Sequence, residues 1–212
     1  MFHHVRSLAL LASISIAPIL RAENHVQNPG FEDGIEGWRL FLPPPHEGAN
    51  VQWTAVNDDP HSGAACLSMT IDEPIRCAIP TKRSFKVLPG EKYRVQAWVK
   101  FAKDARIEPG NPGAYIRATL FEDRGQSTTD PLGNIHIGLN GDVARSPSTG
   151  QLNVQQLPAG WQKIEAVIEI PANDTESLDV ALFSQGVTGT VFWDDVAFEL
   201  VDPKTPLTKV LE

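Results

Sequence analysis

Hydrophobic and polar residues alternate along most of the chain after about residue 50. Short runs rich in β-branched and aromatic residues recur between clusters of Pro, Gly, Asn and Asp, and no long stretch follows the helical period. A period of two predicts strands, and we expect an all-β domain folded as a two-sheet β-sandwich with jelly-roll connections. The predicted strands cover residues 51–56, 65–71, 83–87, 93–101, 114–122, 161–170, 178–184 and 190–200.

One long segment, residues 123–160, breaks this rhythm. It is polar and glycine-rich, and its one weak strand candidate is the run NIHIGL. A long ordered loop on a compact domain commonly carries function, while disorder is the alternative explanation.

The length of the chain fits one domain. We predict a single domain over residues 23–202, followed by a flexible C-terminal tail over 203–212.

The first 22 residues have the order of a secretory signal peptide. Arg6 lies in a short polar start, an apolar run extends from Leu8 to about Leu20, and the small residue Ala22 follows. Pro18 interrupts the apolar run, which is shorter than the roughly 20 residues needed to span a bilayer. The sequence thus predicts cleavage near Ala22, a secreted or periplasmic protein, and no membrane span.

The net charge of the chain excludes one class of binding partner. The chain has 18 Lys and Arg against 26 Asp and Glu, a net charge of −8, which argues against binding nucleic acid.

Export would place the two cysteines, Cys66 and Cys77, in an oxidising compartment. They flank LSMTIDEPIR, which we interpret as two strands joined by a turn at 72–74, so a cross-strand bridge is predicted. Two small buried thiols are the alternative.

Four stretches of the chain, in this order, resemble carbohydrate-binding modules of the cellulose- and xylan-binding group found in secreted glycanases. They are NPGFEDGIEGW at 28–38, HSGAACLSM at 61–69, VLPGEKYRVQAWVK at 87–100, and GWQKIEAVIEIPAND followed by GTVFWDDVAFEL. The resemblance spans residues 26–200 and implies a fold like that of galactose-binding domains. Because this fold serves many unrelated binding roles, the ligand has to be argued from the site.

The resemblance also implies a structural calcium ion. Its ligands would be Glu32 and Asp194, with Asp195 as the alternative aspartate and carbonyl groups of the loop 61–63 as further ligands. Calcium takes six to eight oxygen ligands, which a folded sandwich can gather from distant segments. The alternative is that these acids only cap turns and accept backbone hydrogen bonds.

Strand alternation favours Asp194 over Asp195 as the ligand. In the last predicted strand, Asp194 shares a face with Phe192, Val196 and Phe198. If the apolar members of this set point into the core, Asp194 also points inward and needs a partner or a cation.

A sugar-binding face is predicted on the outward side of two strands. In YRVQAWVKF the apolar residues that face the core alternate with an outward set of Arg94, Gln96, Trp98 and Lys100. In AYIRATLFE the outward set includes Tyr115 and Arg117. Rings stack on the C–H patches of a sugar while amide and guanidinium groups bind its hydroxyls. Trp98, Tyr115 and Arg117 are the main ligand-binding candidates, with Trp53 and Gln96 in support. Alternatively, the segment 123–160 folds over this face and buries it.

The sequence lacks a recognisable catalytic motif. It has no G-x-S-x-G, H-E-x-x-H or C-x-x-C motif and no phosphate-binding glycine loop. The acids that could serve glycoside hydrolysis, Asp58, Asp59, Glu122 and Asp123, fall in a turn or at a strand end. We therefore expect a non-catalytic domain that binds extracellular polysaccharide. The alternatives are a structural or adhesive cell-envelope domain that binds protein, and a jelly-roll enzyme that acts on glycans.

Overall fold

The computed structural model describes residues 22–44, 46–122, 131–139, 143–144 and 157–211, and this part of the chain is built of strands and turns. The predicted signal peptide before Ala22 lies outside the described residues. The described part contains no helix that is long and apolar enough to cross a membrane. The strands are β1 (Val51–Val56), β2 (Cys66–Pro80), β3 (Phe85–Lys86), β4 (Lys92–Phe101), β5 (Arg106–Ile107), β6 (Gly113–Phe121), β7 (Gly133–Ile137), β8 (Val143–Ala144), β9 (Gln162–Glu169), β10 (Ser177–Leu200) and β11 (Val210–Leu211).

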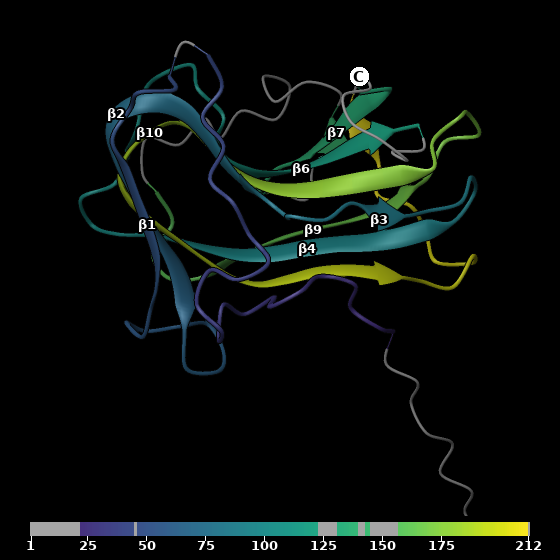
Figure 1. The fold of residues 1–212 in the computed structure, drawn as a ribbon, viewed down its shortest axis with the longest axis horizontal. Helices are drawn as coiled ribbons and strands as arrows, with labels where there is room; N and C mark the ends of the chain where they lie inside the picture. The colour runs from purple at the N-terminus through teal and green to yellow at the C-terminus, as the bar shows by residue number, and fades with distance from the viewer. Residues whose placement is uncertain (1–21, 45, 123–130, 140–142, 145–156, 212) are drawn as a thin grey trace, which may run out of the picture.

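The strands form two layers that share the long strands β2 and β10 (Figure 1). The first half of β10 pairs with β6 and with the second half of β2, and β7 extends this layer beyond β6. The second half of β10 pairs with β4 and with the first half of β2, and β9 and β1 extend this layer. The hydrogen-bonded ladder is therefore continuous, but it is folded over itself. The predicted all-β sandwich is confirmed.

Both long strands bend at the same place as they cross from one layer to the other. The register between β2 and β10 shifts on either side of Val187, opposite the stretch of β2 around Pro74. Gly186 and Gly189 take φ of 67° and 84°, values that favour glycine. The sequence had predicted a turn at 72–74 and separate strands at 178–184 and 190–200. Those breaks were wrong, because the irregular residues are bulges within paired strands.

The core lies between the layers, and the N-terminal loop 28–38 closes one side of it. The Asn28 side chain donates hydrogen bonds to the carbonyls of Gly34 and Glu36, and its backbone carbonyl accepts one from the Trp38 indole. Phe31 and Trp38 are almost completely buried, with ring centroids 5.2 Å apart. This loop thus folds around one asparagine and supplies two aromatic rings to the core.

The predicted disulfide is wrong. Cys66 and Cys77 are both free and buried, and they lie on the same strand, β2. A disulfide joins α-carbons about 4.4–6.8 Å apart, whereas one strand separates its residues by roughly 3.3 Å per position. The expected turn between the two cysteines does not form, so they are never brought opposite each other.

The chain ends differently from the prediction. The segment 203–212 was expected to be a flexible tail, but its residues from Pro203 to Thr208 lie along β4 and β9. The Lys92 ammonium group donates to the carbonyls of Pro203 and Thr205, and Thr208 exchanges two hydrogen bonds with the backbone of Val167. These contacts continue the layer beyond β9.

Part of the long segment 123–160 is a regular strand. NIHIGL forms most of β7, which pairs with β6 and not with the layer that carries Trp98. The weak strand signal was therefore correct.

We predict that Gly189→Ala destabilises the fold much more than Gly90→Ala. Both glycines have φ above 80°, but a Cβ at Gly189 would lie 2.8 Å from the backbone of Asp104 and Ala105, whereas a Cβ at Gly90 would have open space. Positive φ alone costs about 1–2 kcal/mol, and the clash adds to it. Urea denaturation should show a loss of more than about 3 kcal/mol for the first variant only. Equal losses would contradict the close packing at the bend.

The two thiols should be unreactive in the folded protein. Burial raises the pKa of Cys66 to about 11, with Asp194 adding to the effect, and burial raises the pKa of Cys77 to about 12. Since the thiolate is the reactive form, a thiol reagent should label neither cysteine quickly at neutral pH. Without reductant, both should react once the chain is unfolded in denaturant. A species lacking titratable thiols under those conditions would show that a disulfide forms after all.

Candidate functional site

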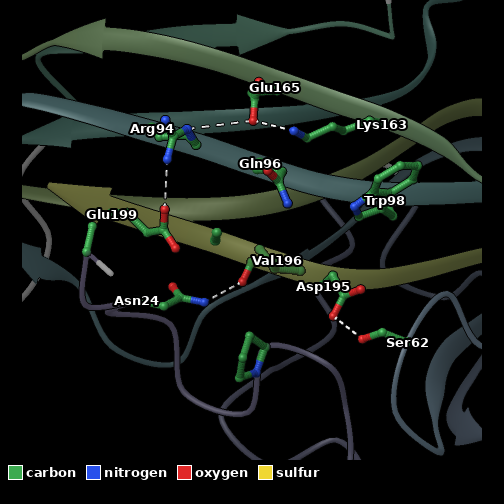
Figure 2. Close-up of a pocket in the computed structure, with 13 residues that line it drawn as sticks. Asn24, Ser62, Arg94, Gln96, Trp98, Lys163, Glu165, Asp195, Val196 and Glu199 are labelled. Atoms are coloured by element: carbon green, nitrogen blue, oxygen red, sulfur yellow. Dashed lines mark hydrogen bonds and ion pairs between the residues drawn. The ribbon is translucent and has the colours of Figure 1, made fainter. Parts of the chain in front are cut away.

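A pocket of about 710 Å³ lies on the outer face of the layer that contains β4, β9 and the second half of β10 (Figure 2). Alternation along β4 buries Tyr93, Val95, Ala97 and Val99 in the core and turns the residues between them outward. The outward residues therefore form the floor of the pocket. Its polar and aromatic lining includes Asn24, Arg94, Gln96, Trp98, Lys163, Glu165, Asp195 and Glu199.

Ion pairs hold the charged side chains of the pocket in place. Arg94 lies between two acids, 3.2 Å from Glu199 and 3.7 Å from Glu165, and the Lys163 ammonium group lies 2.6 Å from Glu165 (Figure 2). These side chains are partly exposed, so each pair stabilises the fold by less than about 1 kcal/mol. Their effect is to orient donors and acceptors around Gln96.

Trp98 lies at one end of the pocket, with His61 stacked on it. The two ring centroids are 3.8 Å apart at an interplanar angle of 18°, and Trp161 meets His61 edge-on at 5.9 Å. Trp98 is half-buried, so the rest of its indole still lines the pocket. The cover over this ring comes from the loop at His61. The sequence had suggested the segment 123–160, whose described strand β7 lies in the other layer.

Lys100 closes the aromatic end of the site. Only 9% of the residue is exposed, and its ammonium group lies over the rings of Trp161 and Phe192 at 4.8 and 4.6 Å. It also donates to the backbone carbonyl of Asp59 at 2.9 Å. No local pattern could predict this contact, because the three partners of Lys100 come from separate segments.

Asp194 is completely buried and is bound by the backbone of the loop 61–65. One of its oxygens accepts hydrogen bonds from the amides of His61 and Ser62, and the other accepts one from the amide of Asp195. Burial raises the pKa of Asp194 to about 6, although the backbone hydrogen bonds act in the opposite direction. Asp195 is held by the ring of His61 and the hydroxyl of Ser62.

The inward orientation predicted for Asp194 was wrong, although its burial was foreseen. Asp194 pairs with Trp98 across the sheet, so it lies on the outer face together with the pocket. A bulge follows in β10, where Asp195 has φ of 46° and the register shifts before Ala197. This extra residue changes the face that the following residues occupy. Asp194 is covered by a loop and not by the core.

Glu32 approaches the same place from the N-terminal loop. Its carboxylate accepts hydrogen bonds from the amides of Ala64 and Ala65, and a Cβ added at Gly63 would overlap it as it lies. An added Cβ at Gly30 would lie 3.5–3.8 Å from one oxygen each of the three acids predicted to bind calcium. The three acids therefore gather around one glycine. As they lie, no three His, Cys, Asp or Glu side chains of the described part form a metal-binding group.

The structure divides the predicted sugar-binding residues among three places. Trp98 and Gln96 both line the pocket. Tyr115 and Arg117 lie in the other layer, where Tyr115 is only 3% exposed. Trp53 is half-buried and packs against the main core. The alternation of β4 and β6 correctly placed these residues on outward faces, but it could not show that the two faces point away from each other.

Solved structures with the same fold include carbohydrate-binding modules. A CBM4 carbohydrate-binding module is 14% identical, with a TM-score of 0.52 over 83% of this chain and 99% of that one. The CBM22-1 and GH10 modules of Clostridium thermocellum endo-1,4-β-D-xylanase 10B, complexed with xylohexaose, are 14% identical, with a TM-score of 0.52 over 85% of this chain. The enzymatically active domain of bacteriophage CBA120 tailspike protein 4 is 13% identical, with a TM-score of 0.55 over 84% of this chain.

These similarities are structural. The chain spans 21% of the tailspike chain and 29% of the xylanase chain. No family model and no curated protein matches the sequence. What the chain shares with these proteins is therefore the β-sandwich fold.

Proposed function

We propose that this protein is a secreted, non-catalytic carbohydrate-binding domain that binds polysaccharide in the pocket beside Trp98. The observation that carries the proposal is the presence of an indole next to an amide and a set of oriented ionic groups in one pocket of about 710 Å³. Pockets of this size hold small ligands or a few sugar units. The shared fold with carbohydrate-binding modules supports the same function.

The charges of the pocket suit an uncharged polyhydroxylated ligand. Arg94 and Lys163 are paired with Glu165 and Glu199, so no single sign of charge is left in excess at these groups. A sugar hydroxyl both donates and accepts, and can insert beside such pairs without leaving an unpaired charge. The exposed part of the Trp98 ring would take the apolar side of a sugar.

The ion pairs of Arg94 with Glu165 and Glu199 are unfavourable for glycoside hydrolysis in this pocket. A glycosidase needs two carboxyl groups with different roles, one of them free to donate a proton. Here Glu165 and Glu199 are both bound by Arg94.

The signal-like N-terminus, as read from the sequence, supports action outside the cytoplasm, where extracellular polysaccharides are found.

Trp98→Ala should weaken polysaccharide binding at least tenfold, because loss of a tryptophan that stacks on the ligand costs about 2 kcal/mol. Affinity electrophoresis in gels containing glucan, xylan or mannan measures the retardation. Trp53→Ala is the matched control, since it removes the same side chain from β1, away from the pocket. Retardation lost equally in both variants, or no retardation by any glycan, would contradict the proposal. Release of reducing sugar would indicate an enzyme.

We further propose that calcium binds near Gly30. The donors fit this ion, because Glu32, Asp194 and Asp195 supply hard carboxylate oxygens that converge there, and Asp194 is fully buried. A cation would compensate this buried charge, which the amides of the loop 61–65 now offset only in part. Its place beside the pocket means that it would fix the loop bearing His61.

Calcium at 100 times its dissociation constant should raise the unfolding midpoint by roughly 5–10 °C relative to EDTA, since such binding contributes about 2.7 kcal/mol. Glu32→Gln should abolish most of this rise. Asp33→Asn removes a neighbouring exposed carboxylate and should leave the rise intact. The proposal would be contradicted if calcium left the unfolding midpoint unchanged. It would also be contradicted if Glu32→Gln and Asp33→Asn reduced the calcium-dependent rise equally.

A further inference from the structure

The outer face of the second layer carries a cluster that the pocket does not involve. Its centre is Phe183 on β10, which is fully buried and lies between Ala78 of β2 and Tyr115 of β6 in the sheet register. The rings of Phe183 and Tyr115 are stacked, with centroids 5.0 Å apart and planes at 9°. The Tyr115 hydroxyl donates to the side chain of Gln185, which fixes the edge of this platform.

Two arginines converge on this platform from neighbouring strands. The Cζ atom of Arg117 lies 4.3 Å from the centroid of Phe183, and that of Arg76 lies 5.4 Å from it. Within the described residues, the Nε atom of each arginine is buried and has no hydrogen-bond partner. Ring contact compensates a guanidinium in part, but it satisfies none of its N–H donors.

The electrostatics of this cluster are unfavourable as they stand. Burial lowers the pKa of Arg117, and the charge of Arg76 lowers it further, whereas Tyr115 and Asp179 oppose these effects more weakly. The chain as a whole has a net charge of −8, so this concentration of positive charge is a local exception. Two half-buried like charges, each with an Nε donor that has no hydrogen-bond partner among the described residues, are the arrangement that a bound anion would stabilise.

We propose that Arg76 and Arg117 form a second binding site, for an acidic group carried on a glycan. The group is a carboxylate, as in a uronic acid, or a sulfate ester. A guanidinium presents N–H donors in a planar fork that matches either oxyanion, and the stacked rings hold both forks in place before the ligand arrives. The site lies in the other layer from Trp98, and it does not depend on neutral-sugar binding there.

The plain structural explanation predicts different behaviour. If the arginines only cover Phe183 and Tyr115, replacing them would lower stability and leave binding of anions unchanged. Binding and stability therefore have to be measured on the same variants. Arg83 provides a matched control, because it is an exposed arginine in the loop before β3 and its loss changes net charge equally.

The test is affinity electrophoresis of the whole protein, with its unfolding midpoint recorded, in polygalacturonate, dextran sulfate and neutral dextran. Retardation by an acidic polymer but not by dextran is expected. Arg76→Gln and Arg117→Gln should each reduce it on the order of tenfold, and Arg83→Gln should change it less than about twofold. Arg117→Lys keeps the charge but loses the fork, and should bind more weakly than the wild type while remaining folded.

The polymers separate the two sources of the anion, since polygalacturonate carries carboxylates and dextran sulfate carries sulfates. Trp98→Ala should leave this binding unchanged, so failure of the neutral-sugar proposal and failure of this one are distinguishable. No retardation by either acidic polymer would overturn the inference. The inference would also be overturned if Arg83→Gln reduced the retardation as much as Arg76→Gln and Arg117→Gln do.

Discussion

The fold depends on the pairing of β2 with β10 through a common bend. Each strand runs through both layers, so their ladder joins the layers covalently and by hydrogen bonds. Gly186 and Gly189 make the bend sterically possible, with a neighbouring loop packed directly on Gly189. Because β10 also pairs with β4 and β6, its course decides which side chains lie on each outer face.

A second irregularity in β10 creates the surroundings of the pocket. The bulge at Asp195 lets Asp194 lie on the outer face, while the apolar residues on both sides of it point into the core. A carboxylate at that position needs donors, and the loop 61–65 folds onto it and supplies amides. The same loop brings His61 onto Trp98. The buried acid and the shape of the pocket are therefore parts of one arrangement.

The two outer faces differ in how their charges are balanced. Around the pocket, Arg94 and Lys163 are matched by acids within ion-pair distance. Around Phe183, two guanidinium groups share one ring, and in the described part of the chain the buried Nε of each has no hydrogen-bond partner. Since paired charges accommodate hydroxyl groups and adjacent positive charges favour anions, one sandwich can present two chemically different surfaces. The fold is common to both, and the side chains on each face decide the ligand.

The sequence by itself determined the fold class, most strand positions and the face on which most residues of β4 and β6 lie, because alternation with a period of two is a local property. It therefore placed Trp98 and Gln96 outward correctly. It failed for Asp194, where a bulge in β10 shifts the alternation, and for Trp53, which packs against the core. It could not determine that β2 continues past residues 72–74, because a bend and a turn have similar local composition. Only the tertiary structure decided that Cys66 and Cys77 stay apart, that Tyr115 and Trp98 face opposite sides, and that Arg76 joins Arg117. Those outcomes depend on register between distant strands and on loops that cover them, and no local pattern records either.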